Sequence, residues 1–457
     1  MEHNALPDWI LRKMKPQQET VGLNAEKSKT LLGFLKALIF SSALLQISVF
    51  VSGVLIARTL GPEGRGIYGE ILLYAQGFFT LTCLSLSDGA IYTVPEVKLN
   101  HRRFLPSLLT AFFLLGLLLA FSIFGFHFLR IIDENFRWVL AIIAITWCCY
   151  AVEISFIALE KVRMNFKWVA IVQSGAPVLF SIFVLYIYVQ DLDVSPYEVV
   201  FLFLLAKLVF VLICMVRRWS YLFGGLNTDF MRQSLARGGV LHIALVVSTL
   251  VTMGDRFILS VVGSDQLLGY YFVAYSVAGV GVGIISAVVM NLVFPALVAA
   301  DANDRKKEVA FFLKFTSILS FFPVPPLLLC LPLITPVVYG QAFQASADML
   351  VWLIPAFALN PLKLVIGEVL RSSSRIWQIF SINVVYVSSF SMLFLFNMEG
   401  MSLEFFIFSI GASNLMTIFA GLYFLKRNGD LDTLRDLLPS LVDFYEIYLM
   451  SRSIFRR

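Results

Sequence analysis

The chain has 457 residues, of which 59% are hydrophobic and 14% charged, and its formal net charge is +5. A soluble globular domain is about half apolar and roughly a quarter charged, so this composition excludes a soluble enzyme or binding module and predicts a polytopic membrane protein. The apolar runs reach about 20 residues and lack the alternation of barrel strands, which predicts membrane-spanning helices. The five cysteines lie within these runs, where we expect small apolar residues and neither disulfides nor metal ligands.

Residues 1–30 are polar and mixed in charge, and we expect them to form a cytoplasmic tail. Twelve apolar spans follow, at 31–57, 67–94, 104–129, 138–159, 168–189, 197–216, 238–262, 269–298, 311–334, 347–369, 376–397 and 402–425. In the final tail, 426–457, apolar residues recur at steps of three and four, which predicts an amphipathic helix. This helix is expected to lie either on the inner membrane surface or on the cytoplasmic face of the protein itself.

The distribution of basic residues supports the count of twelve spans. Of the 35 lysines and arginines, 26 fall on one side of the predicted membrane and only four on the other, namely Arg58, Arg65, Arg130 and Arg137. Positive charge stays on the cytoplasmic side of a membrane protein. We therefore expect both termini to be cytoplasmic.

The two halves of the chain resemble each other. An apolar run ends at a glycine-rich turn backed by an aromatic residue both in Leu55–Gly66 and in Phe257–Gly269. Internal repeats of this kind are common in transporters. The sequence therefore predicts an all-α membrane protein with two pseudo-symmetric six-helix lobes, 31–216 and 238–425, joined by a cytoplasmic linker, 217–237, around a central cavity.

Roughly residues 30–425 resemble the Wzx-type polysaccharide flippases, which belong to the superfamily of multidrug and toxin extrusion transporters and lipid II flippases. The likeness lies in Gly- and Leu-rich motifs that follow the family's order: GVLIARTLGPEGRGIYGEILLY, MGDRFILSVVGSDQLLGYYFVAYSV, NLVFPALVAADANDRKK and PLITPVVYGQAFQASADMLVWLIPAFALNPLKLVIGEVLRSSSR. The chain departs from lipid II flippases in having twelve spans, not fourteen. It also lacks the first-span acid that drug extruders often carry.

The resemblance implies alternating access that moves an undecaprenyl-diphosphate-linked oligosaccharide across the bacterial inner membrane. The product would be a surface polysaccharide such as the O-antigen of lipopolysaccharide or an exopolysaccharide. A polysaccharide polymerase and chain-length machinery are the further partners that this role implies. We expect no catalytic activity, metal site, cofactor or nucleic-acid partner.

Charged residues within membrane spans are costly and are functional candidates by default. A diphosphate cargo requires cationic donors, and four residues supply them: Arg58, Lys207, Arg256 and Lys363. For Arg58 the alternative is snorkelling to the headgroups, and for Arg256 it is a salt bridge between helices. Three acids are candidates for coupling to a proton or sodium ion, or else for structural pairing: Asp88, Glu153 and Asp255. Asp255 and Arg256 point about 100° apart on a helix, so they need not pair.

Two rival functions remain. The first is an ion-coupled antiporter for small molecules or drugs on the same architecture, which the cationic set disfavours. The second is a membrane-embedded enzyme such as a polysaccharide polymerase. It is disfavoured because the outer loops are short and carry no nucleophile or metal-ligand motif.

Overall fold

The structure is a computed structural model that describes residues 21–97, 101–128, 137–163, 165–299, 302–373, 375–396 and 402–431. Every regular element in these ranges is helical. Ten segments within them are long and apolar enough to cross a membrane. The prediction of an all-α polytopic membrane protein is therefore confirmed. The expectations for residues 1–20 and for the tail beyond residue 431 fall outside the described residues.

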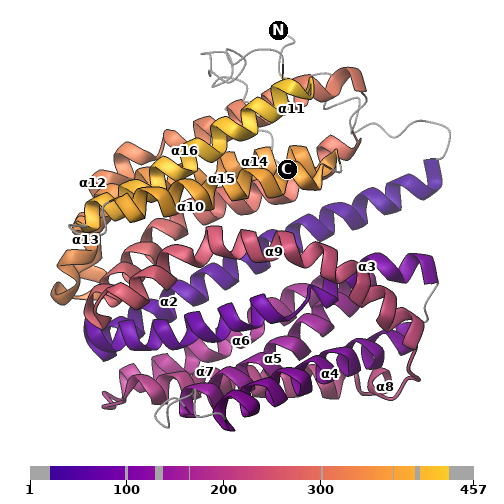
Figure 1. Cartoon of the computed structure of the whole chain (residues 1–457), viewed down its shortest axis with the longest axis horizontal. Coiled ribbons are helices and arrows are strands. Elements are labelled where there is room, and N and C mark those ends of the chain that lie inside the picture. Colours follow the sequence, from indigo (N-terminus) through magenta and orange to yellow (C-terminus); the bar gives the residue numbers. More distant parts are fainter. Residues whose placement is uncertain are drawn as a thin grey trace.

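Each of the twelve predicted spans has a helical counterpart. The first half holds α2 (Val21–Thr82), α3 (Leu86–Val97), α4 (His101–Phe128), α5 (Arg137–Val162), α6 (Phe166–Val189), α7 (Pro196–Arg217) and the short α8 (Trp219–Leu222). The second half holds α9 (Thr228–Val262), α10 (Asp265–Ala299), α11 (Ala302–Phe321), α12 (Val324–Tyr339), η2 (Gln341–Phe343), α13 (Gln344–Ala358), α14 (Asn360–Ser372), α15 (Ile376–Phe396) and α16 (Leu403–Arg427). Figure 1 shows the two halves as neighbouring bundles whose helices run along a common direction.

Local sequence explains where the spans bend or break. At Gly61 the backbone reaches φ 67° and ψ −176°, a region that favours glycine, so α2 bends there into two arms. Span two breaks between α2 and α3, where Leu84 and Ser85 have positive φ. Span nine breaks at Pro323, as its prolines predict, because proline removes a backbone donor.

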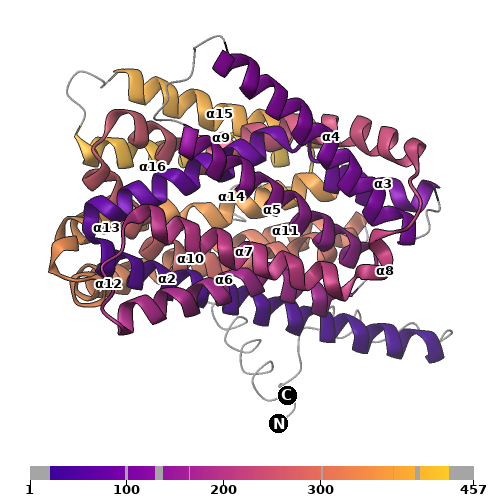
Figure 2. The same ribbon diagram turned by 90° about the horizontal axis from the view of Figure 1, so that it is seen from below.

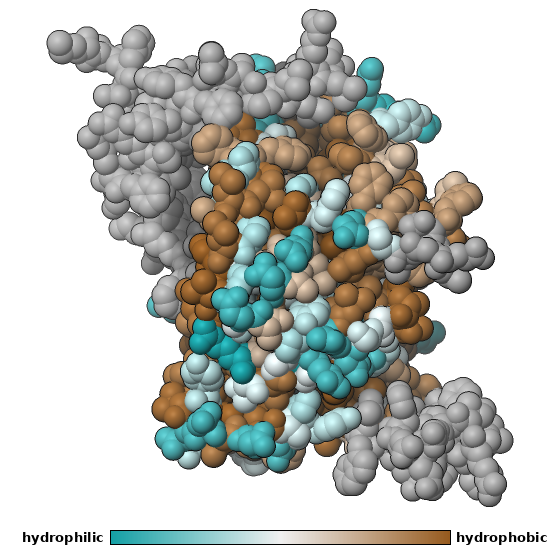
Figure 3. All heavy atoms as spheres, turned by 90° about the vertical axis from the view of Figure 1, so that its left-hand side faces the viewer, coloured by the Kyte–Doolittle hydropathy of each residue, from teal (hydrophilic) through white to brown (hydrophobic). Residues whose placement is uncertain are grey.

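The bundle has two ends that later sections refer to. The signature end is formed by the Gly61 bend, the α9–α10 turn and the α12–α13 turn. The basic end lies opposite and carries the α5–α6, α7–α9 and α14–α15 connections (Figures 1 and 2). Figure 3 views the signature end, where hydrophilic residues gather over the middle and lower part of the face and hydrophobic residues line its flanks.

Each lobe has its own buried core, and two helices contribute to both. Phe230 of α9 is fully buried in the core of the first half, with its ring 5.5 Å from that of Phe104. Ala57 and Leu73 of α2 are buried in the core of the second half. The helix α9 begins at Thr228, inside the stretch expected to be a linker. Helices α2 and α9 therefore each contribute buried residues to both cores.

Glycine pairs bring the lobes into backbone contact at both ends. At the signature end, a Cβ added to Gly66 would lie 1.8 Å from the carbonyl oxygen of Asp265, and one added to Gly269 would lie 1.8 Å from that of Pro62. Toward the basic end, a Cβ added to Gly89 would lie 2.6 Å from the backbone nitrogen of Gly238. Only glycine fits these crossings of α2 with α10 and of α3 with α9.

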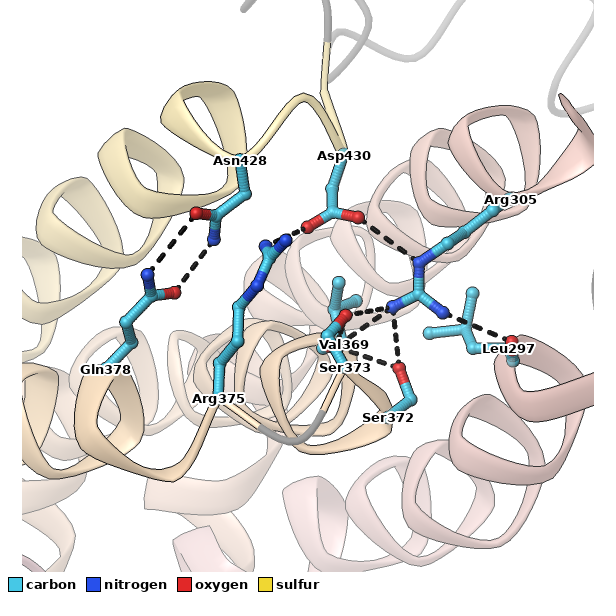
Figure 4. Close-up of polar contacts among 9 residues, drawn as sticks. All are labelled: Leu297, Arg305, Val369, Ser372, Ser373, Arg375, Gln378, Asn428 and Asp430. Atoms are coloured by element: carbon cyan, nitrogen blue, oxygen red, sulfur yellow. Dashed lines mark hydrogen bonds and ion pairs between the residues drawn. The ribbon is translucent and has the colours of Figure 1, made fainter. Parts of the chain in front are cut away.

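A polar network fixes the basic end of the second lobe (Figure 4). Asp430, just after α16, accepts hydrogen bonds from Arg375 Nη1 at 2.8 Å and from Arg305 Nε at 3.2 Å. Beside it, Gln378 and Asn428 exchange hydrogen bonds between their amides. Arg305 also donates to four other oxygens, those of Leu297, Val369, Ser372 and Ser373. The Asp430 carboxylate just after α16 thereby links Arg305 of α11 with Arg375 of the α14–α15 connection.

Candidate functional site

A cavity of about 500 Å³ lies in the second lobe. Helices α9, α10, α13, α14, α15 and α16 supply its walls, and most of its lining is apolar. Its polar lining includes Asp255, Tyr275, Asn360, Lys363, Asn383, Tyr386, Asn414 and Thr417. An apolar cavity with a few convergent polar groups is the usual form of a ligand site.

Lys363 is the central cation of this cavity. It lies on α14, which begins after a break at Leu359 and has Pro361 in its first turn. Its Nζ donates to Asn414 Oδ1 at 2.6 Å and lies 4.6 Å from the centre of the Tyr386 ring. Lys363 forms no ion pair with any of the described residues. An amide oxygen and a ring face stabilise the ammonium, but neither neutralises its charge.

Asp255 on α9 lines the cavity, and Arg256 lies next to it. The Tyr271 hydroxyl donates to Asp255 Oδ2 at 2.5 Å. Arg256 donates to the Thr252 carbonyl oxygen, and its guanidinium carbon lies 4.2 Å from the centre of the Tyr275 ring. Although the two residues are consecutive, Arg256 Nε lies 3.7 Å from Asp255 Oδ1 and forms an ion pair, because the long arginine side chain folds back around the helix.

Lys207 and Glu153 lie in the other lobe and pair with each other. The Lys207 ammonium on α7 donates to the Glu153 carboxylate on α5 and lies 3.9 Å from the centre of the Tyr150 ring. Both side chains are largely buried. The deepest base of the sequence therefore has a carboxylate partner in this conformation.

The remaining two candidates lie away from the cavity. Arg58 donates to the carbonyl oxygens of Val338 and Val337, both at 2.7 Å, and so caps the C-terminal end of α12 from the opposite lobe. A cation stabilises a helix at that end. Asp88 is exposed in the first turn of α3, where a carboxylate complements the free N–H groups.

The structure therefore places Lys363 and Asp255 in the wall of one cavity and pairs Arg256 with that Asp255, whereas Arg58, Lys207, Glu153 and Asp88 lie elsewhere. Sequence reasoning overlooked the amides Asn383 and Asn414 and the rings of Tyr275 and Tyr386. The two amides could have been predicted as candidates from the sequence, because each is a strongly polar side chain inside an apolar span.

The site has the chemistry of an anion or polar-sugar receptor. Its cations, amides and phenols are hydrogen-bond donors, and its tyrosine rings offer apolar faces. Within the described ranges no group of three or more His, Cys, Asp or Glu side chains could hold a metal ion.

Solved structures show the fold of this chain. It is similar to the lipid II flippase MurJ in an inward closed conformation (TM-score 0.71, 14% identity, 93% of this chain and 96% of that one). It is also similar to the MATE multidrug transporter DinF-BH (TM-score 0.62, 12% identity, 91% and 98%). A third is a MOP superfamily transporter from Pyrococcus furiosus (TM-score 0.60, 10% identity, 88% and 95%). The chain therefore has the fold of this transporter superfamily.

Sequence comparison defines the family. A search of curated proteins gives no match. The family model described as polysaccharide biosynthesis protein matches residues 35–301, which is more than half of the chain. Together with its membrane-spanning helices and transporter fold, this match shows that the protein belongs to the polysaccharide biosynthesis protein family.

Proposed function

We propose that this protein is a flippase for undecaprenyl-diphosphate-linked oligosaccharides and that the second-lobe cavity receives the polar head of the cargo. Family and fold support a lipid-linked flippase or transporter. The cargo is a saccharide on a polyprenyl diphosphate, used to build a surface polysaccharide such as O-antigen or exopolysaccharide. The protein supplies no covalent chemistry and works by alternating access.

One observation carries the choice of an anionic cargo, namely that the Lys363 ammonium lines the cavity and forms no ion pair with the described residues. A half-buried ammonium of this kind costs free energy, and an anionic ligand offsets that cost. Arg256 lies behind the Tyr275 ring and becomes a second cation for the cargo when it separates from Asp255. Phosphate oxygens are well matched to such donors, and the amides of Asn383 and Asn414 suit sugar hydroxyls.

The cargo divides between two environments. Its polyprenyl chain is apolar and stays in lipid, while the diphosphate and sugars cross through the protein. The glycine crossings at the two ends are where the lobes part, since each holds two backbones together without interlocking side chains. Arg58 and Lys207 then bind the head group in other conformations, after release from α12 and from Glu153 respectively.

Cell location and partners follow from the same proposal. The protein lies in the bacterial inner membrane, with the basic end and both termini in the cytoplasm. A polysaccharide polymerase with its chain-length machinery receives the cargo on the outer side.

Transport in vesicles tests the proposal. Inverted membrane vesicles are supplied with a radiolabelled short-chain polyprenyl-diphosphate oligosaccharide, and translocation is followed for wild type, Lys363→Ala and Lys363→Arg. We expect saturable transport by wild type, loss with Lys363→Ala and partial retention with Lys363→Arg. Lys426→Ala, which alters an exposed lysine at the end of α16, is the matched control and should transport normally. Wild type that moves no polyprenyl-linked saccharide contradicts the proposal.

An ion-coupled small-molecule antiporter is the second candidate, favoured by the buried carboxylate of Asp255 in the cavity wall. Asp255 is also our first choice for the coupling ion, ahead of Glu153, which is paired, and Asp88, which is exposed. Efflux of a cationic dye that requires Asp255 and a proton or sodium gradient, without saccharide transport, would support this candidate.

A further inference from the structure

Arg65 is a buried cation without a polar partner. It lies in the glycine-rich turn of the signature end, where α2 meets α10, and its side chain is only 9% exposed. It makes no hydrogen bond or ion pair within the described part of the chain, and its Nε is buried without an acceptor. It does contact two rings, with the guanidinium carbon 5.3 Å from the centre of Tyr68 and 5.7 Å from that of Phe272.

A second unpaired group lies nearby. Tyr339, at the end of α12, is 2% exposed, and its hydroxyl is buried without a hydrogen-bond partner. It lies within electrostatic range of the Arg65 guanidinium. Arg65 and Tyr68 belong to one lobe, whereas Phe272 and Tyr339 belong to the other. Tyr339 and Phe272 belong to one buried cluster, and Arg65 lies over Phe272, so the two unpaired groups lie on opposite lobes beside the same seam.

The neighbouring Arg58 shows what is missing at Arg65. Both arginines lie at the signature end, yet Arg58 has two carbonyl oxygens of α12 and the Tyr188 hydroxyl as partners. Ring faces repay only a part of the cost of burying a guanidinium. Arg65 retains a planar set of unfilled donors, and Tyr339 adds one hydroxyl donor. Such a set suits an anion with several oxygens, and phosphate is the best match.

We propose that Arg65 and Tyr339 form a phosphate-ester site in the seam at the signature end, which fills when the lobes begin to part there. Phosphate that enters is held from both lobes and replaces the ring contacts of the closed state. If the cargo is the diphosphate lipid proposed above, this is its last site before release, and that identification rests on the proposed function. A phospholipid headgroup in the same leaflet offers the same chemistry.

Binding of inorganic pyrophosphate tests the site. Full-length protein in phosphatidylcholine nanodiscs is titrated calorimetrically in a Lys363→Met background, which removes the cavity lysine. A hydrogen bond to a charged group is worth roughly tenfold or more in affinity, so we expect Arg65→Gln to weaken binding about tenfold or more and Tyr339→Phe by about threefold or more. Arg217→Gln removes an arginine that stacks on Trp168 at the basic end, and it should leave affinity within about twofold.

Thermal stability separates a ligand site from a structural role. If Arg65 is an uncompensated charge, Arg65→Met should hold or raise the melting temperature of the free protein. Unchanged pyrophosphate affinity in Arg65→Gln, together with a lower melting temperature in Arg65→Met, would overturn the proposal.

Two further comparisons assign the ligand. If a phospholipid headgroup is the natural ligand, anionic phosphatidylglycerol in the nanodisc should compete with pyrophosphate, and this competition should require Arg65. If the cargo is the natural ligand, phosphatidylglycerol should not change the affinity for pyrophosphate. A wild-type protein that binds pyrophosphate through Arg65 and yet moves no polyprenyl-linked saccharide would support the phosphate site and would contradict only the proposed function.

Discussion

Each lobe holds a lysine within its helices, buried for Lys207 and half-buried for Lys363, and the two lysines have different partners. Lys207 in the first lobe pairs with Glu153 across two helices, over the ring of Tyr150. Lys363 in the second lobe is also placed over a tyrosine ring, but it reaches the amide oxygen of Asn414. The lysine of the first lobe is therefore paired with a carboxylate, whereas that of the second lobe is paired with a neutral amide.

The difference shows how a repeated architecture acquires an asymmetric site. A buried ion pair satisfies itself and leaves little attraction for a ligand, whereas a half-buried lysine beside an amide keeps its charge available. Both arrangements keep the ammonium hydrogen-bonded, so both tolerate burial. The assignment of anion binding to the second lobe rests on this one difference, an amide partner for the lysine in place of a carboxylate partner. The predictions below test the assignment.

The largest effect is expected from breaking the pair of the first lobe. Glu153→Gln leaves the Lys207 ammonium buried without a counter-charge, which should lower the free energy of unfolding by about 3–5 kcal/mol. Denaturation of the protein in mixed micelles measures this change in the free energy of unfolding. The double variant Lys207→Met with Glu153→Leu removes both charges and should recover stability to within about 1 kcal/mol of wild type. A single variant as stable as wild type would show that the pair is not a buried one.

The next effect concerns the carboxylate of the second lobe. Tyr271→Phe removes the 2.5 Å hydrogen bond to Asp255, and a bond to a charged group contributes about 1.5–3 kcal/mol. We expect a loss of stability of that size in the same denaturation assay. Tyr386→Phe is the control, since the Tyr386 hydroxyl has no hydrogen bond among the described residues, and it should change stability by about 0.5 kcal/mol or less. Equal losses in both variants would contradict the assignment.

Giving the lysine of the second lobe a carboxylate partner, as in the first lobe, should impair transport. Asn414→Asp places a carboxylate beside Lys363, and the diphosphate of the cargo must then displace it. We expect translocation to fall about tenfold, equivalent to about 1.4 kcal/mol. The variant also loses the hydrogen bond from Asn414 Nδ2 to the Ala356 carbonyl oxygen at 3.0 Å. Asn414→Leu, which removes the amide without adding charge, controls for lost hydrogen bonds. Normal transport by Asn414→Asp would rule out Lys363 as an anion site.

The smallest effect is expected at the basic end, where the lobes are alike. Glu160 in the first lobe accepts from Arg218 at 2.6 Å, as Asp430 in the second accepts from Arg375 at 2.8 Å. Asp430→Asn should cost about 1 kcal/mol, because Arg375 is partly exposed and its attraction is screened. Glu160→Gln should cost more, since that carboxylate is 2% exposed. The reverse order in thermal unfolding would show that exposure does not govern these pairs.

Sequence alone determined the class of this protein, the positions of its helices and the charged residues worth testing. Apolar run length and the asymmetry of basic residues are local or additive properties, so they can be read without a fold. Glycine at the α2 bend and proline in span nine likewise act through their own backbone geometry. Every predicted span therefore has a helical counterpart in the structure.

Only the tertiary structure decided which charges meet. Lys207 contacts Glu153, which is 54 positions away in the sequence, and Lys363 contacts Asn414, which is 51 positions away. A membrane helix is apolar toward lipid as well as toward the protein core, so the hydrophobic pattern does not mark its inward face. Rotation of each helix about its own axis, which decides whether a lysine meets a carboxylate, an amide or a cavity, is fixed by packing between helices far apart in the sequence.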